Sequence, residues 1–239
     1  MIRPYAQGRR WILYGADCLA VLADGLVPED AAIIGDPPFG MRNNTDSTRF
    51  SGGRAKNNRR GQGRDDYAIV HGDDQAFDPA PWLEFPQVVL WGSNHFAARL
   101  PIGTTLVWIK KGAHLFGTFL SDAEVAWVKG GCGVYCHEAW FPPPARAVEA
   151  GNPGGSPAHP NQKPIELLRW CFVRAKVPTD AVVFDGWAGS GSCGVAAIGS
   201  GRRYIGCEIE PSYLPVAARR LAQAEADGVP QLLFGGGAA

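Results

Sequence analysis

Short runs of Val, Ile and Leu recur along the chain, each bounded by Gly, Pro or Asp, and stretches with helical periodicity separate some of them. This pattern is typical of a mostly parallel sheet. Because no clear helix separates the fourth run from the fifth, we expect those two to form an antiparallel hairpin at one edge. The pattern predicts seven strands, at Trp11–Tyr14, Ala31–Gly35, Gln87–Trp91, Thr104–Ile109, Ala123–Val128, Ala181–Asp185 and Arg203–Cys207.

Prolines indicate where two helices begin. Pro164 opens the run IELLRWCFVRAK, and Pro211 opens SYLPVAARRLAQAEA, although Pro215 falls within the first turn or so of the second run. Two other stretches lack apolar periodicity. Residues 41–66 are rich in Gly, Asn, Arg and Ser and are predicted to be a mobile loop, and residues 141–159 are predicted to be a second loop.

The length and composition suit one large α/β domain over residues 1–239, with helices on both faces of the sheet. A hydrophobic content of 46% is enough to build a core. No apolar run approaches the roughly 18 residues of a membrane-spanning helix, and the first residues, MIRPYAQGRR, lack the apolar stretch of a signal peptide. We therefore expect a cytoplasmic protein that does not associate with a membrane.

The cysteines do not indicate a metal centre. None of the six forms a CxxC pair, and several lie in apolar runs, so reduced and buried thiols are expected. Cys132, Cys136 and His137 form one cluster, but it lacks a second ligand pair at zinc spacing. We expect no bound metal.

The first chemical motif is Asp36-Pro37-Pro38-Phe39, directly after the apolar run AAIIG. Two prolines fix the backbone, remove two N–H donors and leave carbonyl oxygens beside a carboxylate, a corner suited to accept hydrogen bonds from an NH2 group. Phe39 offers a flat face on which a base can stack. A simple Asp-Pro-Pro turn is an equal alternative for these four residues taken alone. Asn94 and His95, after VVLWGS, are further candidates to line a base pocket, or are structural hydrogen-bonders.

The second motif is DGWAGSGS at residues 185–192, after the apolar run AVVF. A glycine-rich turn from strand to helix lets a ligand approach the backbone, and the N–H groups at the start of the helix suit a carboxylate or phosphate. Glu208, at the end of the next strand, is placed to accept hydrogen bonds from ribose hydroxyls. A nucleoside-bearing cofactor is implied. Gly189, Gly191 and Gly194 also fit GxGxxG, so a dinucleotide site of the NAD type competes at this motif.

Together, four blocks resemble the amino-methyltransferase family of DNA methylases, in the permuted order with the catalytic block ahead of the cofactor block. The resemblance runs from WILYGADCLAVL, at 11–22, through the helix after Pro211. It implies a Rossmann-like methyltransferase fold, S-adenosylmethionine as cofactor and methyl transfer to the exocyclic amino group of a base in DNA. The blocks are DPPFG at 36–40, HPNQKPIELL at 159–168, VVFDGWAGSGS at 182–192 and YIGCEIEPSY at 204–213.

The resemblance also implies residue roles. Asp36 and the Pro37 carbonyl, in the corner completed by Pro38, would accept hydrogen bonds from the target amino group, with Phe39 stacked on a flipped base. Phe39 stands where Tyr is more usual, and Trp187 where Phe is more usual, but both keep an aromatic face. The expected cofactor residues are Asp185, Trp187, Gly189, Ser190, Gly191 and Ser192 for the methionine part, Lys163 and Pro164 closing over it, Glu208 for the ribose and Asp17 near the adenine.

Charge points to DNA as the partner. Lys plus Arg equals Asp plus Glu over the whole chain, but the segment from Arg42 to Arg64 has seven basic residues against one acid, Asp46. It directly follows the catalytic corner, and its Arg and Asn side chains suit phosphates and base edges. The expected DNA-binding residues are Arg42, Arg49, Arg54, Lys56, Arg59, Arg60 and Arg64.

Adenine N6 is the favoured target, and three alternatives remain. Methylation of cytosine N4 uses the same geometry, although Ser in place of Asp36 is more typical there. A dinucleotide-dependent oxidoreductase would explain the glycine loop but leaves DPPF and NQKP without a role. A nonenzymatic DNA-binding module would explain the basic segment but not the corner that accepts an NH2 group. The sequence leaves the choice between monomer and homodimer open.

Overall fold

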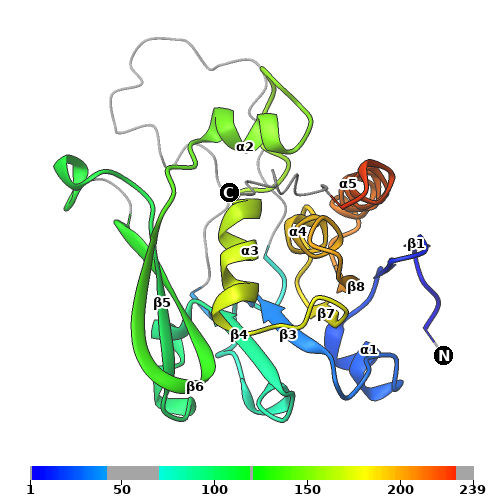
Figure 1. Ribbon diagram of the computed structural model, residues 1–239, viewed down its shortest axis with the longest axis horizontal. Helices are drawn as coiled ribbons and strands as arrows, with labels where there is room; N and C mark the ends of the chain where they lie inside the picture. The colour runs from blue at the N-terminus through cyan, green and yellow to red at the C-terminus, as the bar shows by residue number, and fades with distance from the viewer. Residues whose placement is uncertain (1, 42–69, 119–120, 230–239) are drawn as a thin grey trace, which may run out of the picture.

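The computed structural model describes residues 2–41, 70–118 and 121–229, and these form a twisted sheet covered by helices (Figure 1). Its strands follow the order β1-β2-β8-β7-β3-β4-β6-β5. The five strands from β2 to β4 in this order are parallel neighbours. The strands are β1 (Ala6–Gln7), β2 (Trp11–Tyr14), β3 (Ala32–Gly35), β4 (Gln87–Trp91), β5 (Gly103–Ile109), β6 (Ala123–Glu138), β7 (Val182–Asp185) and β8 (Arg203–Cys207).

All seven strands expected from the apolar runs are present, and three have the predicted bounds. The eighth, β1, pairs antiparallel with β2 and was missed because two residues show no alternation. β6 continues ten residues past the predicted end at Val128, to Glu138. Its first part pairs with β5 in opposite directions, from Thr104 with Val128 to Ile109 with Ala123, as the hairpin prediction required. Its second part returns along β5 in the same direction, from Thr105 with Val134 to Ile109 with Glu138.

The helices of the described residues agree with the sequence less closely. α3 follows Pro164, as predicted. The second predicted helix begins later than expected. α5 begins at Leu214, three residues after Pro211, and Pro215 lies in its first turn, where a missing N–H costs no hydrogen bond. The predicted loop 141–159 is irregular only in part, because it contains α2. The bounds are α1 (Cys18–Ala23), α2 (Pro143–Glu149), α3 (Ile165–Arg174), α4 (Ser192–Ile198) and α5 (Leu214–Asp227).

Alternating strand residues fill two separate cores. On β3, Ile34 packs in the layer formed with α3, α4 and α5, whereas Ile33 packs on the opposite face. That second face is covered by α1 and by 3₁₀ turns, and its buried residues include Val21 of α1 and Trp82. Helices therefore cover both faces, as a parallel sheet of apolar strands requires. Figure 1 shows α3, α4 and α5 together, with β5 and β6 at one end of the sheet.

The described cysteines only partly match the expectation of buried thiols. Cys18, Cys171, Cys193 and Cys207 are buried, but Cys132 and Cys136 are exposed, because they lie on the part of β6 that extends beyond the core. Over residues 2–41, 70–118 and 121–229, His, Cys, Asp and Glu side chains form no group of three that could hold a metal ion. In the same residues no helix has both the length and the apolar character needed to cross a bilayer.

Candidate active site

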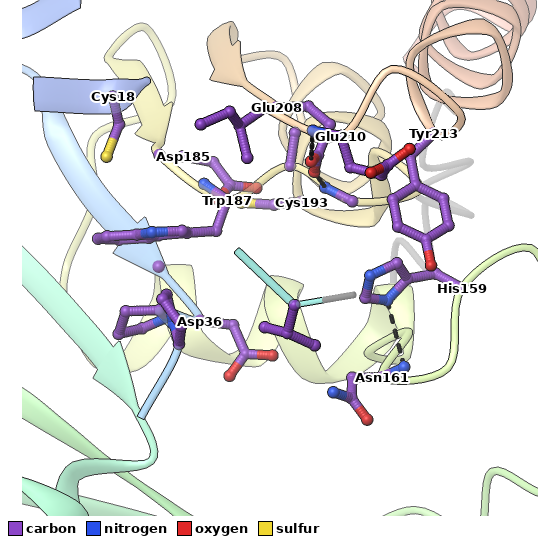
Figure 2. A pocket seen from close by; sticks show the side chains of 18 of the residues that line it. Cys18, Asp36, His159, Asn161, Asp185, Trp187, Cys193, Glu208, Glu210 and Tyr213 are labelled. Carbon is purple, nitrogen blue, oxygen red and sulfur yellow. Dashed lines mark hydrogen bonds between the residues drawn. The ribbon is translucent and has the colours of Figure 1, made fainter. Parts of the chain in front are cut away.

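The carboxyl ends of β3, β4, β7 and β8 meet at one edge of the sheet, and a cavity of about 270 Å³ lies there. Its walls contain the whole Asp36–Phe39 corner, most of the glycine-rich loop, and Asp17, Lys163 and Glu208. Figure 2 shows Asp36 on one side of the Trp187 ring and Asp185 on the other. Two predicted cofactor residues are absent from the walls. Pro164 instead caps the start of α3, and Gly191 caps α4.

Backbone hydrogen bonds hold the corner after β3. One carboxylate oxygen of Asp73, Oδ1, accepts from the N–H groups of Phe39, Gly40 and Met41, at 3.1, 2.9 and 3.0 Å. Asp73 is buried, so these charge-assisted bonds are shielded from water. Gly92 lies against the Phe39 ring with φ +69°, and a Cβ there would stand 1.9 Å from a ring carbon. The ring can therefore occupy its place only because residue 92 is glycine.

Phe39 and Trp187 occupy different aromatic environments. The Phe39 ring stacks on His95, with centroids 4.9 Å apart and planes at 10°. Trp187 makes edge contacts with Phe77 and Trp82, at 5.5 and 5.2 Å. Phe39 thus has one face against an exposed histidine, whereas Trp187 is anchored in the core.

Asp36 is held by ion pairs that the sequence did not reveal. Its Oδ2 lies 2.5 Å from Lys163 Nζ, and the same ammonium lies 3.1 Å from Glu124 Oε2. Glu124 Oε1 accepts in turn from Lys110 Nζ at 2.8 Å. Asp36 Oδ1 is buried and has no hydrogen-bond partner within the described part of the chain. One oxygen of Asp36 is therefore committed to Lys163, and the other is left for a ligand.

Burial and charge act in opposite directions on these groups. Burial raises the pKa of Asp36, and Lys163 offsets only part of this increase. Burial also raises the pKa of Glu124, but Lys163 and Lys110 outweigh it and bring that pKa to about 2. Burial alone would lower the pKa of Lys163, but Asp36 and Glu124 raise it above its ordinary value. Lys163 is therefore positively charged and lies between two carboxylates.

The glycine-rich loop begins at Asp185, the last residue of β7. Asp185 Oδ1 accepts from the Trp187 N–H at 3.0 Å, and Oδ2 lies 3.3 Å from the Tyr204 hydroxyl. Burial raises the pKa of Asp185 to about 7, although both hydrogen bonds oppose this shift. A positively charged ligand beside it would favour the ionised form.

Glu208 ties the end of β8 to this loop. Its Oε2 accepts from the Gly189 N–H, and its Oε1 from the Glu210 N–H, both at 2.7 Å. Each oxygen accepts one backbone bond and keeps lone-pair capacity for hydroxyl groups. Glu208 is therefore placed both to order the loop and to accept from a ligand.

Arg220 of α5 supports the loop from behind. This buried guanidinium donates to the Ser190 carbonyl, the Ser190 hydroxyl and the Ser192 hydroxyl, at 2.8, 2.9 and 3.1 Å. Both hydroxyl oxygens accept from Arg220 and lie 3.5 Å apart, so one hydroxyl can donate to the other or to a ligand, and both residues line the cavity.

His159 and Tyr213 form the wall opposite Asp36 (Figure 2), with ring centroids 4.5 Å apart. The His159 Nδ1 accepts from the Asn161 N–H at 3.2 Å, so its Nε2 bears the proton in the neutral ring. Burial, and then the charges of Lys163 and Arg146, lower the pKa of His159 to about 4. His159 is therefore neutral near pH 7.

The predicted DNA-binding residues, from Arg42 to Arg64, lie outside the described residues. Of the two other base-pocket candidates, His95 stacks on Phe39, and Asn94 is exposed beside it.

Comparison with known proteins agrees with three of the four blocks. Residues 129–219 match the model of the DNA methylase family N6_N4_Mtase. The expected family resemblance is confirmed. The matched part of the chain includes the HPNQKP block and the glycine-rich loop, whereas the DPPF corner precedes it.

Two relatives share this DNA methylase similarity over short segments. The DNA adenine methyltransferase YhdJ of Escherichia coli K12 is 44% identical over 63 residues, which are 26% of this chain and 21% of YhdJ. The type II methyltransferase M.HinfI of Haemophilus influenzae is 42% identical over 69 residues, 29% of this chain and 19% of M.HinfI. The alignments thus span about a fifth of each relative.

Solved methyltransferase structures share the fold over most of the chain. The cytosine-N4-specific PvuII DNA methyltransferase superposes with a TM-score of 0.58, at 15% identity, over 92% of this chain and 89% of that one. TTHA0409 of Thermus thermophilus, in complex with S-adenosyl-L-methionine, gives 0.51 at 19% identity, over 92% of this chain and 94% of that one. The expected Rossmann-like methyltransferase fold is therefore confirmed.

Sequence reasoning missed Asp73, Glu124 and Arg220. Arg220 carried one usable signal, because it is a charged residue amid the apolar positions of the α5 helix. Asp73 and Glu124 lie in segments without a motif, and only the folded chain brings them to the corner.

Proposed function

We propose that this protein transfers a methyl group from S-adenosylmethionine to the N6 amino group of adenine in DNA. The observation that carries the proposal is one cavity that joins the DPPF corner to the glycine-rich loop, with the free Oδ1 of Asp36 buried beside it. The similarity to YhdJ, which is named as a DNA adenine methyltransferase, favours N6. The PvuII enzyme shares the fold, which is common to both amino targets, so cytosine N4 is the competing product.

The cavity fits S-adenosylmethionine in charge and hydrogen bonding. This cofactor has an ammonium, a sulfonium, a carboxylate and ribose hydroxyls, and it supplies an activated methyl group when bound. Asp185 would pair with its positive end, and the hydroxyls of Ser190 and Ser192 would donate to the carboxylate. Glu208 would accept from the ribose, and Asp17, whose Oδ1 already caps α1, would lie toward the adenine.

Asp36 and Pro37 would act on the target amino group. An adenine amino nitrogen is a weak nucleophile because its lone pair is delocalised into the ring. Acceptance of its two hydrogens by Asp36 Oδ1 and the Pro37 carbonyl would favour a pyramidal nitrogen and offset the positive charge that develops on it. As the N–C bond forms and the S–C bond breaks, the surplus proton of the nitrogen passes to Asp36. Phe39 would stack on the flipped base and offset part of the lost duplex stacking.

The basic segment between Arg42 and Arg64 would contact the DNA. It joins the corner at Gly40 and Met41, so it would lie along the strand whose base enters the cavity. Its charges would neutralise phosphates and make the affinity sensitive to salt. The same segment is proposed to contribute to the choice of target sequence.

The test is methylation of a mixed DNA pool with S-adenosylmethionine labelled on its methyl carbon. Nucleoside mass spectrometry is expected to show label in N6-methyladenine. Asp36→Ala should reduce transfer at least about 1,000-fold, since it removes a charged acceptor from the transition state. Its cofactor affinity, measured by calorimetry, should remain within about threefold, because the loop is untouched.

Asp30→Ala is the matched control, because it removes an exposed carboxyl just before the opposite end of β3. It should leave both measurements unchanged. Label in N4-methylcytosine would show that cytosine, not adenine, is the substrate. Undiminished transfer by Asp36→Ala would refute the role assigned to Asp36.

A further inference from the structure

Lys163 stands between two carboxylates in a position that methyl transfer alone does not explain. Its side chain is 7% exposed, and its Nζ lies 2.5 Å from Asp36 and 3.1 Å from Glu124. The groups come from distant parts of the chain: the end of β3, the segment before α3, and β6. A buried charge costs several kcal/mol unless it is paired, so such an arrangement persists only where its partners are well placed.

Resting on the proposed function, we propose that Lys163 and Glu124 are opposing positioning residues that together set the orientation and the ionisation of Asp36. Lys163 draws the carboxyl group toward its charged form, and Glu124 limits that effect. The reacting acceptor is then Asp36 Oδ1, while the pair acts only through Asp36.

Orientation follows from the different surroundings of the two Asp36 oxygens. Oδ2 is bound to Lys163, so the carboxyl group cannot rotate without breaking that pair. Lys163 is itself fixed, by Glu124 and by its position 5.5 Å from the centroid of the Trp91 ring. Oδ1 is left as the acceptor that faces the ligand.

Ionisation follows from the charges that surround Asp36. Burial and the Glu124 carboxylate raise the pKa of Asp36, whereas Lys163 and, more weakly, Lys110 lower it. Asp185, across the cavity on β7, is a further carboxylate whose pKa is raised in part by Asp36. An Asp36 paired with Lys163 alone would hold its proton weakly and accept the surplus proton of the substrate poorly. With Glu124 present, the Lys163 charge is shared between two carboxylates, so the pKa of Asp36 stays higher than Lys163 alone would leave it.

This assignment modifies the role that the family resemblance implied for Lys163. The residue lines the cavity, as a cofactor contact would, but the bonds of its ammonium within the described chain go to Asp36 and Glu124. We expect its removal to affect the corner more than cofactor binding.

Opposite shifts of the acid limb of the pH–rate profile are the decisive readout. The transfer rate at saturating cofactor and DNA should fall at low pH as Asp36 takes up a proton. In Glu124→Gln this limb should move about one pH unit lower, because a group that raises the pKa of Asp36 is lost. In Lys163→Met it should move about one unit higher, because the group that lowers this pKa is lost. A merely structural role would not produce opposite signs.

Lys111→Met is the matched control. Lys111 pairs with Asp122 at 2.7 Å, beside Lys110 in sequence, and Lys111 is not among the charges that act on Asp36. The acid limb of the pH–rate profile of Lys111→Met should coincide with that of the unmodified protein. If Lys163→Met fails to fold, Lys163→Arg and Glu124→Gln provide the comparison, with Arg expected to retain the original limb.

A direct titration separates this inference from the proposed function. The ¹³C resonance of the Asp36 carboxyl, assigned by its absence from Asp36→Asn, reports ionisation whether or not DNA is methylated. Opposite shifts of its midpoint in Glu124→Gln and Lys163→Met would support the inference. Coincident midpoints, or shifts of the same sign, would overturn it even if methylation proceeds. Opposite shifts in a protein that methylates no DNA would refute the proposed function and leave the positioning of Asp36 intact.

Discussion

The two sides of the cavity are built in different ways. The cofactor side comes largely from one stretch of the sequence: Asp185 ends β7, the glycine-rich loop follows it, and Glu208 follows the next strand, β8. The corner side is assembled from distant segments, since Asp73 holds the backbone of Phe39, and Lys163, 127 residues from Asp36, pairs with the Asp36 carboxylate. A local motif can therefore predict the first side, whereas the second requires the fold.

This difference predicts that the two sides can be damaged separately, and, after Asp36→Ala itself, the largest effect should come from Asp73→Ala. The substitution frees the N–H groups of Phe39, Gly40 and Met41, so the corner loses its fixed geometry. We expect the transfer rate at saturating substrates to fall about 100-fold, because misplacement of about 1 Å has an effect of that order. The cofactor dissociation constant should stay within about threefold.

The exposed neighbour Asp74→Ala serves as the control and should match the unmodified protein in both measurements. If Asp73→Ala lowered cofactor affinity as much as it lowered the transfer rate, the two sides of the cavity would not be independent.

The complementary prediction concerns Glu208→Gln, on the cofactor side. An amide offers one acceptor in place of two and turns an NH2 group toward a backbone N–H, either at Gly189 or at Glu210. We expect cofactor affinity, measured by calorimetry, to fall about tenfold, the equivalent of about 1.4 kcal/mol. The rate at saturating cofactor should change less than about threefold. A variant with normal affinity and a slow rate would place Glu208 with the corner instead.

The features that the sequence predicts, and those that it misses, divide in the same way between the cofactor side and the corner side. The strands were predicted because buried parallel strands are continuous apolar runs, and the short β1 was missed because two residues show no pattern. The start of α5 was misplaced because Pro211 and Pro215 both suit a first turn. The motifs identified Asp36 and Glu208, whereas Asp73 and Glu124 lie in segments where isolated acids are ordinary surface residues.

Lys163 shows the limit of reasoning from motifs. The resemblance implies that Lys163 closes over the cofactor but holds no information on its carboxylate partners; the structure places it in the cavity wall, paired with Asp36. Ion pairs between distant segments depend on register and packing, which no local pattern encodes. The interactions of Asp36 in the corner are therefore the part of the site that the sequence predicts least.

The smallest predicted effect is a pH dependence of stability that arises on the cofactor side. Burial raises the pKa of Asp185 to about 7, well above the ordinary value of 3.8 that it recovers when the chain unfolds. Between these two values the unfolded chain releases the proton and the folded chain keeps it, so the free energy of unfolding falls as the pH rises. Asp185→Asn removes this contribution. We expect the free energy of unfolding of the unmodified protein, relative to that of the variant, to decrease by about 1 kcal/mol between about pH 6 and pH 7.

Urea unfolding of both proteins at the two pH values measures this difference, and other titrating groups cancel because both proteins contain them. Asp180→Asn, an exposed carboxyl just before the opposite end of β7, is the control and should track the unmodified protein. The cofactor should reverse the trend, because its positive charge favours ionised Asp185, so saturating S-adenosylmethionine is expected to stabilise the protein more at about pH 7 than at about pH 5. Parallel pH profiles for Asp185→Asn and the unmodified protein would mean that Asp185 is already ionised without a ligand. The cofactor side would then resemble the corner, with its charge set by its protein neighbours and not by what it binds.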